Sequence, residues 1–336
     1  MATTKISELN PLASGSTCAA AVLPIVNDGT TDKISIDDLR GTLRGASNQS
    51  TGVSSTSTVS GGKNNTASGN YSVIGGGRQN TADTDMSTVG GGFCNVSSGT
   101  CSTIAGGREN LAACSRASIG GGFKNRACGN LSTISGGYCN LITGNFSTIG
   151  GGCNATVTGA CSTIAGAKFS TVSAALGFIA GGRNNTVSDY GSNIAGGWLN
   201  TVSGGASTIG GGSANTVSGG CSVIAGGKQN KITGNTSTIG GGCCNTICTI
   251  NSTIIGGCCN TINPSGPTSA ILGGINNVAA CPCSFIAGIG ITARACSALH
   301  VNNLLLETGS IPTSDPGIPG MLFIAGGALK VSGCIA

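Results

Sequence analysis

The stretch that decides the fold is Ser-Thr-Ile-Gly-Gly-Gly-Ser-Ala-Asn-Thr-Val-Ser-Gly, at residues 207–219. Close variants recur along most of the chain, and we call the apolar residue of each Ser-Thr-Ile triplet the anchor. The first fourteen anchors are spaced by 15 residues, and two more follow a two-residue insertion within residues 263–267. The anchors are Val59, Ile74, Val89, Ile104, Ile119, Ile134, Ile149, Ile164, Ile179, Ile194, Ile209, Ile224, Ile239, Ile254, Ile271 and Ile286. A fixed period of this kind is typical of architectures in which each repeat stacks on the next.

Three positions of the repeat are nearly constant. Serine stands two residues before fourteen anchors, glycine two residues after all sixteen, and asparagine six residues after thirteen. The alternation in Ser-Thr-Ile and Asn-Thr-Val has the period of a strand, and the glycine-rich joins indicate turns. The sequence therefore predicts an all-β fold, a parallel β-solenoid (β-roll) of sixteen 15-residue coils. At the constant glycine we expect either φ above zero or a need for an absent side chain.

Stacking of coils places like residues over one another, about 4.8 Å apart. We expect the asparagines to form a hydrogen-bonded ladder, which satisfies polar groups that face inward. The expected interior of Ser, Ile, Asn and Val is thin, so we expect three chains to associate through the glycine-lined face as a homotrimer. The coil from Lys168 to Phe178 departs from the pattern and predicts a bent or thickened turn.

Composition narrows the function classes. Charged residues make up 8% of the chain, and the net charge of +5 is not concentrated in any Lys/Arg-rich run. Nucleic acid is therefore not an expected partner. The N-terminus lacks the layout of a signal peptide, and no apolar run approaches the roughly 18 residues of a membrane span, so we expect no membrane insertion. The 18 cysteines fit synthesis in a reducing cytoplasm.

The repeated phrase, from about Ser57 to Gly288, resembles the head repeats of trimeric autotransporter adhesins and their relatives in phage fibres. The resemblance implies a trimeric, left-handed parallel β-roll, although the coil of those proteins is slightly shorter. Residues 1–50, with K-I-S-E-L at residues 5–9, look like the virion-attachment segment of tailed-phage fibre proteins. Residues 298–336 look like the small β-rich tip of phage fibres. The chain is thus divided into an attachment segment, a repeat shaft at residues 51–297 and a tip.

These resemblances imply a structural fibre or spike protein of a tailed bacteriophage that mediates attachment to the host surface. It would be made in the host cytoplasm and located in the virion. The implied partners are two further copies of the chain, other virion proteins bound through residues 1–50, and a glycan or protein of the host cell surface. Two alternatives stay open, namely a capsid-decorating or baseplate protein without receptor binding, and a tailspike that degrades surface polysaccharide.

The sequence predicts no catalytic residues and no cofactor. His300 is the sole histidine, and it lies in an apolar stretch without an arguable Ser-His-Asp arrangement. No glycine run continues to Gly-Lys-Ser/Thr, as a phosphate-binding loop would. Acidic residues such as Asp83, Glu109 and Asp189 are scattered, whereas a glycosidase gathers them in a groove. We therefore expect a protein that is not an enzyme.

One outward pattern lies four residues after the anchor. Basic and aromatic residues alternate there and suit cation–π contact between neighbouring coils. They form either a strip that touches an anionic or sugar-bearing host surface or a packing contact between subunits, and the second interpretation is favoured because a turn near a threefold axis needs filling. The residues of this strip are Arg78, Phe93, Arg108, Phe123, Tyr138, Arg183 and Trp198.

Cysteines also stack at the 15-residue period. Adjacent coils bring their Cα atoms to about 4.8 Å, which is within the range of disulfides. The pairs that could form are Cys243 with Cys258, Cys244 with Cys259, and Cys281 with Cys296. Small free thiols are the default expectation, and no metal site is predicted because the spacing simply follows the coil.

Overall fold

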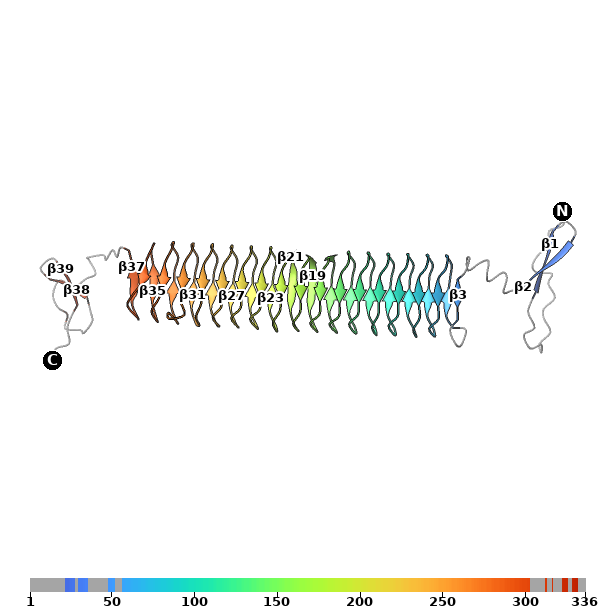
Figure 1. Cartoon of the computed structure of the whole chain (residues 1–336), viewed down its shortest axis with the longest axis horizontal. Helices are drawn as coiled ribbons and strands as arrows, with labels where there is room; N and C mark the ends of the chain where they lie inside the picture. The colour runs from blue at the N-terminus through green and yellow to red at the C-terminus, as the bar shows by residue number, and fades with distance from the viewer. Residues whose placement is uncertain are drawn as a thin grey trace. The chain divides into compact units, whose positions relative to one another are not determined.

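The computed structural model describes residues 22–27, 30–35, 48–51, 56–302, 312, 316, 322–325 and 328–331. These residues form strands and turns and contain no helix. The predicted parallel β-solenoid is confirmed, with about 17 turns of about 15 residues (Figure 1). Each end of the sixteen expected coils carries one further strand: β3 (Gln49–Ser50) pairs with β5 (Thr66–Ala67) ahead of the first anchor, and Leu299–Val301 pairs with the strand of the last anchor, Ile286. The chain divides into two compact units, Met1–Gly226 and Gly227–Ala336.

In the unit Met1–Gly226, each turn adds one strand to each of two parallel sheets. The anchor strands are β4 (Thr58–Val59), β6 (Val73–Ile74), β8 (Thr88–Val89), β10 (Thr103–Ile104), β12 (Ser118–Ile119), β14 (Thr133–Ile134), β16 (Thr148–Ile149), β19 (Thr163–Lys168), β21 (Phe178–Arg183), β23 (Asn193–Ile194), β25 (Thr208–Ile209) and β27 (Val223–Ile224). After β3 and β5, the second sheet continues with β7 (Thr81–Ala82), β9 (Val96–Ser97), β11 (Leu111–Ala112), β13 (Arg126–Ala127), β15 (Leu141–Ile142), β18 (Thr156–Val157), β20 (Thr171–Val172), β22 (Thr186–Val187), β24 (Thr201–Val202) and β26 (Thr216–Val217).

The unit Gly227–Ala336 repeats the same construction. Its anchor strands are β29 (Thr238–Ile239), β31 (Thr253–Ile254), β33 (Ala270–Ile271), β35 (Phe285–Ala287) and β37 (Leu299–Val301). Its other strands are β28 (Lys231–Ile232), β30 (Thr246–Ile247), β32 (Thr261–Ile262), β34 (Val278–Ala279) and β36 (Thr292–Ala293). Two antiparallel pairs stand outside the solenoid pattern, β1 (Val22–Asn27) with β2 (Thr30–Ser35), and β38 (Leu322–Ala325) with β39 (Ala328–Val331).

The core of a turn is closed within a single chain. In one turn Ser132, Ile134, Asn140 and Ile142 are each 0% exposed, and the neighbouring turns bury the equivalent residues. The inward side chains are small enough for the two sheets of one chain to cover them. A trimer is therefore not needed to complete this burial, contrary to the reason for association that the sequence suggested.

The predicted asparagine ladder is confirmed, and most of its bonds go to the backbone. Oδ1 of Asn110 accepts the backbone N–H of Asn125 at 3.0 Å, and Nδ2 of Asn110 donates to the carbonyls of Gly106 at 3.1 Å and Gly122 at 3.0 Å. Nδ2 of Asn110 also donates to Oδ1 of Asn95 at 3.1 Å. Each asparagine thus joins three successive turns and holds the carbonyl two residues after its own anchor.

The glycine that needs an unusual backbone conformation is the third residue after the anchor. There φ is 89° at Gly107, and a Cβ would lie 2.3 Å from the carbonyl oxygen of Gly122. At Gly106, two residues after its anchor, φ lies outside the left-handed region and a Cβ would meet no atom within 4 Å. The position that requires glycine is thus the third residue after the anchor and not the second, as the sequence suggested. At Gly106 nothing in the described chain requires glycine.

The departure at residues 168–178 is an extended turn. Ala155 and Ser170 replace two ladder asparagines, and Ala167 stands where most turns have the left-handed glycine. Where Ala167 and Ser170 replace the glycine and the asparagine, β19 continues through the corner as a six-residue strand. It pairs with β17 (Gly152–Cys153) and with β21, which is also six residues long although its turn keeps Gly182 and Asn185. The predicted bent or thickened coil is therefore a locally straightened one.

Candidate functional site

The turn that follows the anchor strand carries the predicted outward strip. Residues four positions after the anchor form parallel β-bridges with their equivalents one coil away, as at Arg78 with Phe93 and Phe93 with Arg108. The backbone N–H of Phe93 donates to the carbonyl of Gly107 at 3.0 Å, and that of Arg108 donates to Gly122 at 2.9 Å. These backbone hydrogen bonds between coils therefore set the side chains of the strip one strand spacing apart.

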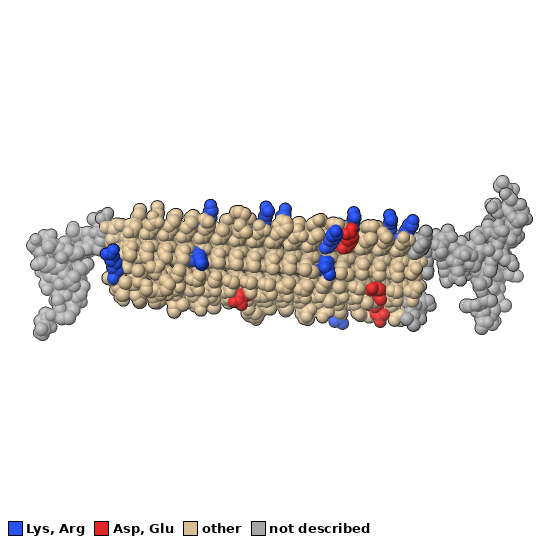
Figure 2. Space-filling model, viewed as in Figure 1, with Lys and Arg blue, Asp and Glu red and all other residues tan. Residues whose placement is uncertain are grey.

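The structure brings five of the seven predicted strip residues into one stack. The guanidinium carbon of Arg78 lies 5.6 Å from the ring centroid of Phe93, and that of Arg108 lies 5.4 Å from the same ring. Arg108 also lies 5.3 Å from the ring of Phe123, whose centroid is 5.4 Å from that of Tyr138. We call Arg78, Phe93, Arg108, Phe123 and Tyr138 the corner stack. Figure 2 shows Lys and Arg side chains projecting along one edge of the molecule.

A double-mutant cycle tests this stack. Phe93→Leu combined with Arg108→Gln should give a coupling free energy of about 0.5–1 kcal/mol, because each exposed cation–π contact contributes about that much. The measurement is urea unfolding of the four variants of the cycle. Tyr71→Leu combined with Arg108→Gln is the control and should give additive effects, since Tyr71 lies on the opposite turn. Additivity for Phe93 with Arg108 as well would contradict the contact.

The other two predicted strip residues behave differently. Arg183 and Trp198 are paired by a backbone bridge. The guanidinium carbon of Arg183 lies 5.9 Å from the ring of Phe169, and Nζ of Lys168 lies 5.3 Å from that ring. Sequence reasoning missed Phe169 as the partner because it stands five residues after its anchor, where φ is 52° and strand alternation no longer applies.

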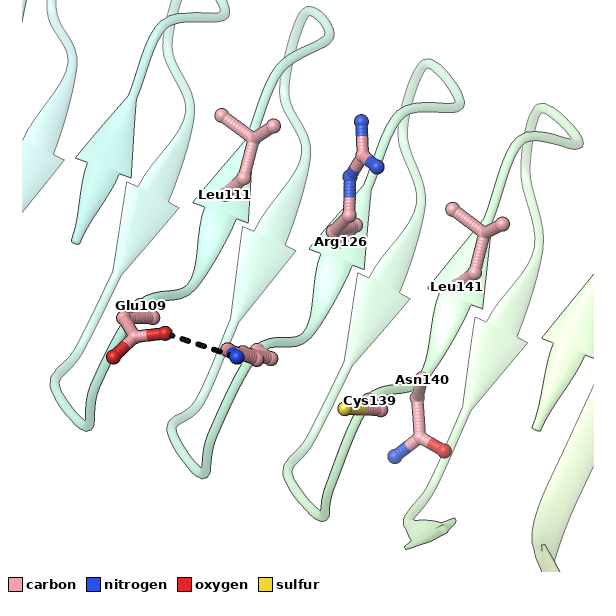
Figure 3. A pocket seen from close by; sticks show the side chains of 7 residues that line it. Glu109, Leu111, Arg126, Cys139, Asn140 and Leu141 are labelled. Atoms are coloured by element: carbon pink, nitrogen blue, oxygen red, sulfur yellow. Dashed lines mark ion pairs between the residues drawn. The ribbon is translucent and has the colours of Figure 1, made fainter. Parts of the chain in front are cut away.

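Beside the corner stack the surface is hollowed, with a volume of about 440 Å³. Figure 3 shows Leu111, Arg126 and Leu141 on three successive strands of the second sheet, with Glu109 and Cys139 on the adjoining turns. Oε1 of Glu109 lies 2.9 Å from Nε of Arg108, and its Oε2 lies 3.5 Å from Nζ of Lys124. Among the residues that line this hollow, Lys124 and Arg126 are cationic and Glu109 is anionic, so the lining carries one net positive charge.

Large apolar side chains mark the opposite turn, twelve residues after the anchor. Tyr71 is 64% exposed and Phe146 61%, and both have φ near 56°. Met86, Leu131 and Leu176 share this position and are also exposed. Bulky residues in the left-handed region are strained, and their exposure gains nothing from the hydrophobic effect. The sequence alone does not predict this edge, because the position has no constant residue type.

The predicted cysteine pairs are placed side by side, and the described cysteines are free thiols. Cys243 and Cys258 form a parallel backbone bridge. A hydrogen bond with the thiol of Cys281 raises the pKa of Cys296. Disulfide formation stays a prediction. Within the described residues, no group of three or more His, Cys, Asp or Glu side chains could hold a metal ion.

The remaining functional assignments concern the ends of the chain. His300 lies on β37, with Nε2 3.0 Å from the carbonyl oxygen of Ala295. Most of the predicted attachment segment (residues 1–50) and tip (residues 298–336) lies outside the described residues, so both roles stay predictions. In the described part of the chain, no helix has the length and apolar character needed to cross a membrane.

Neither a scan against protein-family models nor a search of curated proteins finds a match to this chain. The function proposed below therefore rests on the repeat, the geometry of the turns and the resemblance of the sequence to fibre repeats.

Proposed function

We propose that this chain is a structural fibre or spike protein of a tailed bacteriophage virion, that it is a homotrimer, and that it mediates host-surface attachment without catalysis. Residues 1–50 would bind other virion proteins and the solenoid would serve as the shaft. The observation that carries the proposal is the regular register of the described turns within each unit. Like residues pair with like residues turn after turn, as in Thr186 with Thr201 and Ile239 with Ile254.

Such a register suits a mechanical part. Parallel backbone ladders and the asparagine ladder link each turn to its neighbours, so no turn can open without breaking bonds to two others. The turns between strands are short, which leaves few loop tips where a protease could cut. Both properties favour a particle component that persists outside a cell.

Self-association is supported by the shape of the corner. Bare glycine backbone two residues after the anchor, as at Gly76, Gly91 and Gly106, has open space around it or only ordinary contacts. Two residues further on, the same corner carries the bulky side chains of the corner stack. Close approach of bulky groups on one chain to glycine backbone on another would bury both, which explains a glycine that the single chain does not require.

The oligomer is tested by native mass spectrometry of the full chain. A trimer has three times the 32.3 kDa of one chain, about 97 kDa. Gly76→Leu, Gly91→Leu and Gly106→Leu together should convert the trimer into folded monomer with an unchanged β circular dichroism spectrum. The matched control places leucine at Val73, Thr88 and Thr103, which face outward one residue before the anchor, and should remain trimeric. A wild-type monomer would overturn the homotrimer.

Location is tested by immunogold electron microscopy of phage particles that contain this chain. Antibodies against residues 56–302 should label fibres or spikes that project from the tail. Labelling spread over the head would instead support the capsid-decorating alternative, and labelling confined to the baseplate would support a structural role there. Loss of adsorption to host cells after antibody treatment is expected if the fibre contacts the host.

A further inference from the structure

Four thiols gather on one corner of the unit Gly227–Ala336. Cys243 and Cys258 stand four residues after their anchors, and Cys244 and Cys259 follow them directly. Sγ of Cys243 lies 3.2 Å from Sγ of Cys244, and Sγ of Cys258 lies 3.3 Å from Sγ of Cys259. The thiols of adjacent cysteines thus touch, and Cys244 also has a smaller side-chain hydrogen-bond interaction with Cys259, one of the pairs one coil apart that the sequence suggested.

The backbone explains this arrangement. In a strand, successive side chains point to opposite faces, so neighbouring cysteines would not meet. Here the second cysteine of each pair is in the left-handed region, with φ of 55° at Cys244 and 56° at Cys259. This conformation turns its side chain toward that of the preceding residue. The backbone N–H of Cys259 donates to the carbonyl of Cys243 at 2.9 Å and helps to fix the turn.

Disulfides between the coils would be harder to form. Strand neighbours in register lie about 4.8 Å apart with parallel Cα–Cβ bonds, whereas a disulfide needs Cβ atoms about 3.8 Å apart. The backbone ladder resists such a movement, because the N–H of Cys243 donates to Gly257 and that of Cys258 donates to Gly274, both at 3.0 Å. Pairing within a turn starts from two thiols that already touch, and it requires strain in the peptide unit between them but no movement of one coil against the next.

We propose that Cys243–Cys244 and Cys258–Cys259 are two reversible thiol–disulfide sites, each forming a disulfide between adjacent residues when a small disulfide such as oxidised glutathione is present. This inference is independent of the proposed function. Adjacent Cα atoms are about 3.8 Å apart, shorter than the usual disulfide range, so the product is strained and easily reduced. Such a bond is a redox-responsive group and not a permanent cross-link.

The reaction proceeds by two exchanges. One cysteine thiolate attacks a sulfur of oxidised glutathione, forming a mixed disulfide and releasing one glutathione thiolate. The neighbouring thiolate then attacks the protein sulfur of the mixed disulfide, forming the Cys–Cys bond and releasing the second glutathione. Each pair loses two electrons and two protons, and one oxidised glutathione becomes two reduced ones.

The electrostatics of the cluster predict the pH dependence. The hydrogen bond with Cys259, followed by desolvation, raises the pKa of Cys258 to about 11, and the hydrogen bond with Cys243 raises the pKa of Cys244. The reactive thiolate is the deprotonated form, so the oxidation rate should rise as the pH increases from 7 toward 10.

Peptide mapping of the full chain tests the proposal. The protein is incubated with oxidised glutathione at pH 8.5, remaining thiols are blocked with N-ethylmaleimide, and thermolysin cuts before Ile250 and Ile254. The expected products are two separate peptides, one with Cys243 and Cys244 and the other with Cys258 and Cys259. Each of these peptides should be lighter by two hydrogens than its reduced, unlabelled form. Cys248 should carry the blocking group, and treatment with dithiothreitol should restore labelling of all four thiols.

Three results would overturn the proposal. These are a covalent link between the two peptides, a link between two chains, and complete labelling of the four thiols. Cys259→Ser should leave Cys258 with a persistent glutathione adduct, because the resolving thiol is gone. Cys161 is the internal control, since it is exposed, has φ of 53° and has no cysteine next to it in the chain. It should form the mixed disulfide and keep it.

Discussion

Gly107→Ala is expected to lower the free energy of unfolding by about 2–6 kcal/mol. Holding a non-glycine residue at this φ costs about 1–3 kcal/mol, and forcing a methyl group into occupied space costs about 1–3 kcal/mol more. The methyl carbon would overlap the carbonyl oxygen of Gly122 and crowd Nδ2 of Asn110, which lies 2.6 Å from the Cβ position. The substitution therefore destabilises both the turn at Gly107 and the asparagine ladder at Asn110.

The neighbouring glycine provides the control. Measured on the single chain, in a background that carries the leucine substitutions at Gly76 and Gly91, Gly106→Ala should change stability by less than about 1 kcal/mol, because its Cβ meets open space within the chain and alanine lowers the entropy of the unfolded chain. Thermal unfolding followed by circular dichroism, with hydrogen exchange of residues 95–125, compares the two variants. Equal losses at both positions would refute the assignment of the strained glycine.

Asn125→Ala is expected to cost about 2–6 kcal/mol. Asn140 N–H loses its acceptor, Oδ1 of Asn125 at 3.0 Å, and the carbonyl of Gly121 loses its donor, Nδ2 of Asn125 at 2.9 Å. Leaving a buried polar group without a partner costs about 1–3 kcal/mol. The amide of Asn140 should also lose its protection against hydrogen exchange.

Asn130→Ala is the matched control within the same turn of the chain. The side chain of Asn130 is exposed, and its backbone N–H donates to Oδ1 of Asn145 whatever the side chain is. This variant should stay within about 0.5 kcal/mol of wild type. If the two asparagine variants unfold alike, the ladder does not stabilise the solenoid.

The natural exceptions at Ala155 and Ser170 show how the ladder can be interrupted. Both stand where asparagine is usual, and the corner beside them is rebuilt as the longer strands β19 and β21. A single Asn125→Ala change leaves the glycine of its own corner, Gly122, in place, whereas Ala167 replaces this glycine in β19. The effect of losing an asparagine therefore depends on the conformation of its turn.

The sequence by itself determined the period, the strand positions and the identity of the core. The anchors and the asparagines recur at fixed offsets, and a strand that alternates inward and outward residues leaves no other face for them. The order of the corner stack also follows, since a 15-residue turn sets Phe93 between Arg78 and Arg108. In a regular solenoid, residues 15 positions apart in the sequence lie next to each other on adjacent coils.

Only the tertiary structure decided how the turns are made. Left-handed backbone conformations occur at Cys244, Phe169 and Leu131, and these residue types do not predict such conformations. These conformations are imposed by hydrogen bonds from the turn to the preceding coil, such as Cys244 N–H to the carbonyl of Lys228 at 2.9 Å. Because they reverse strand alternation, they decide which thiols touch, which ring meets Arg183 and which apolar side chains face outward.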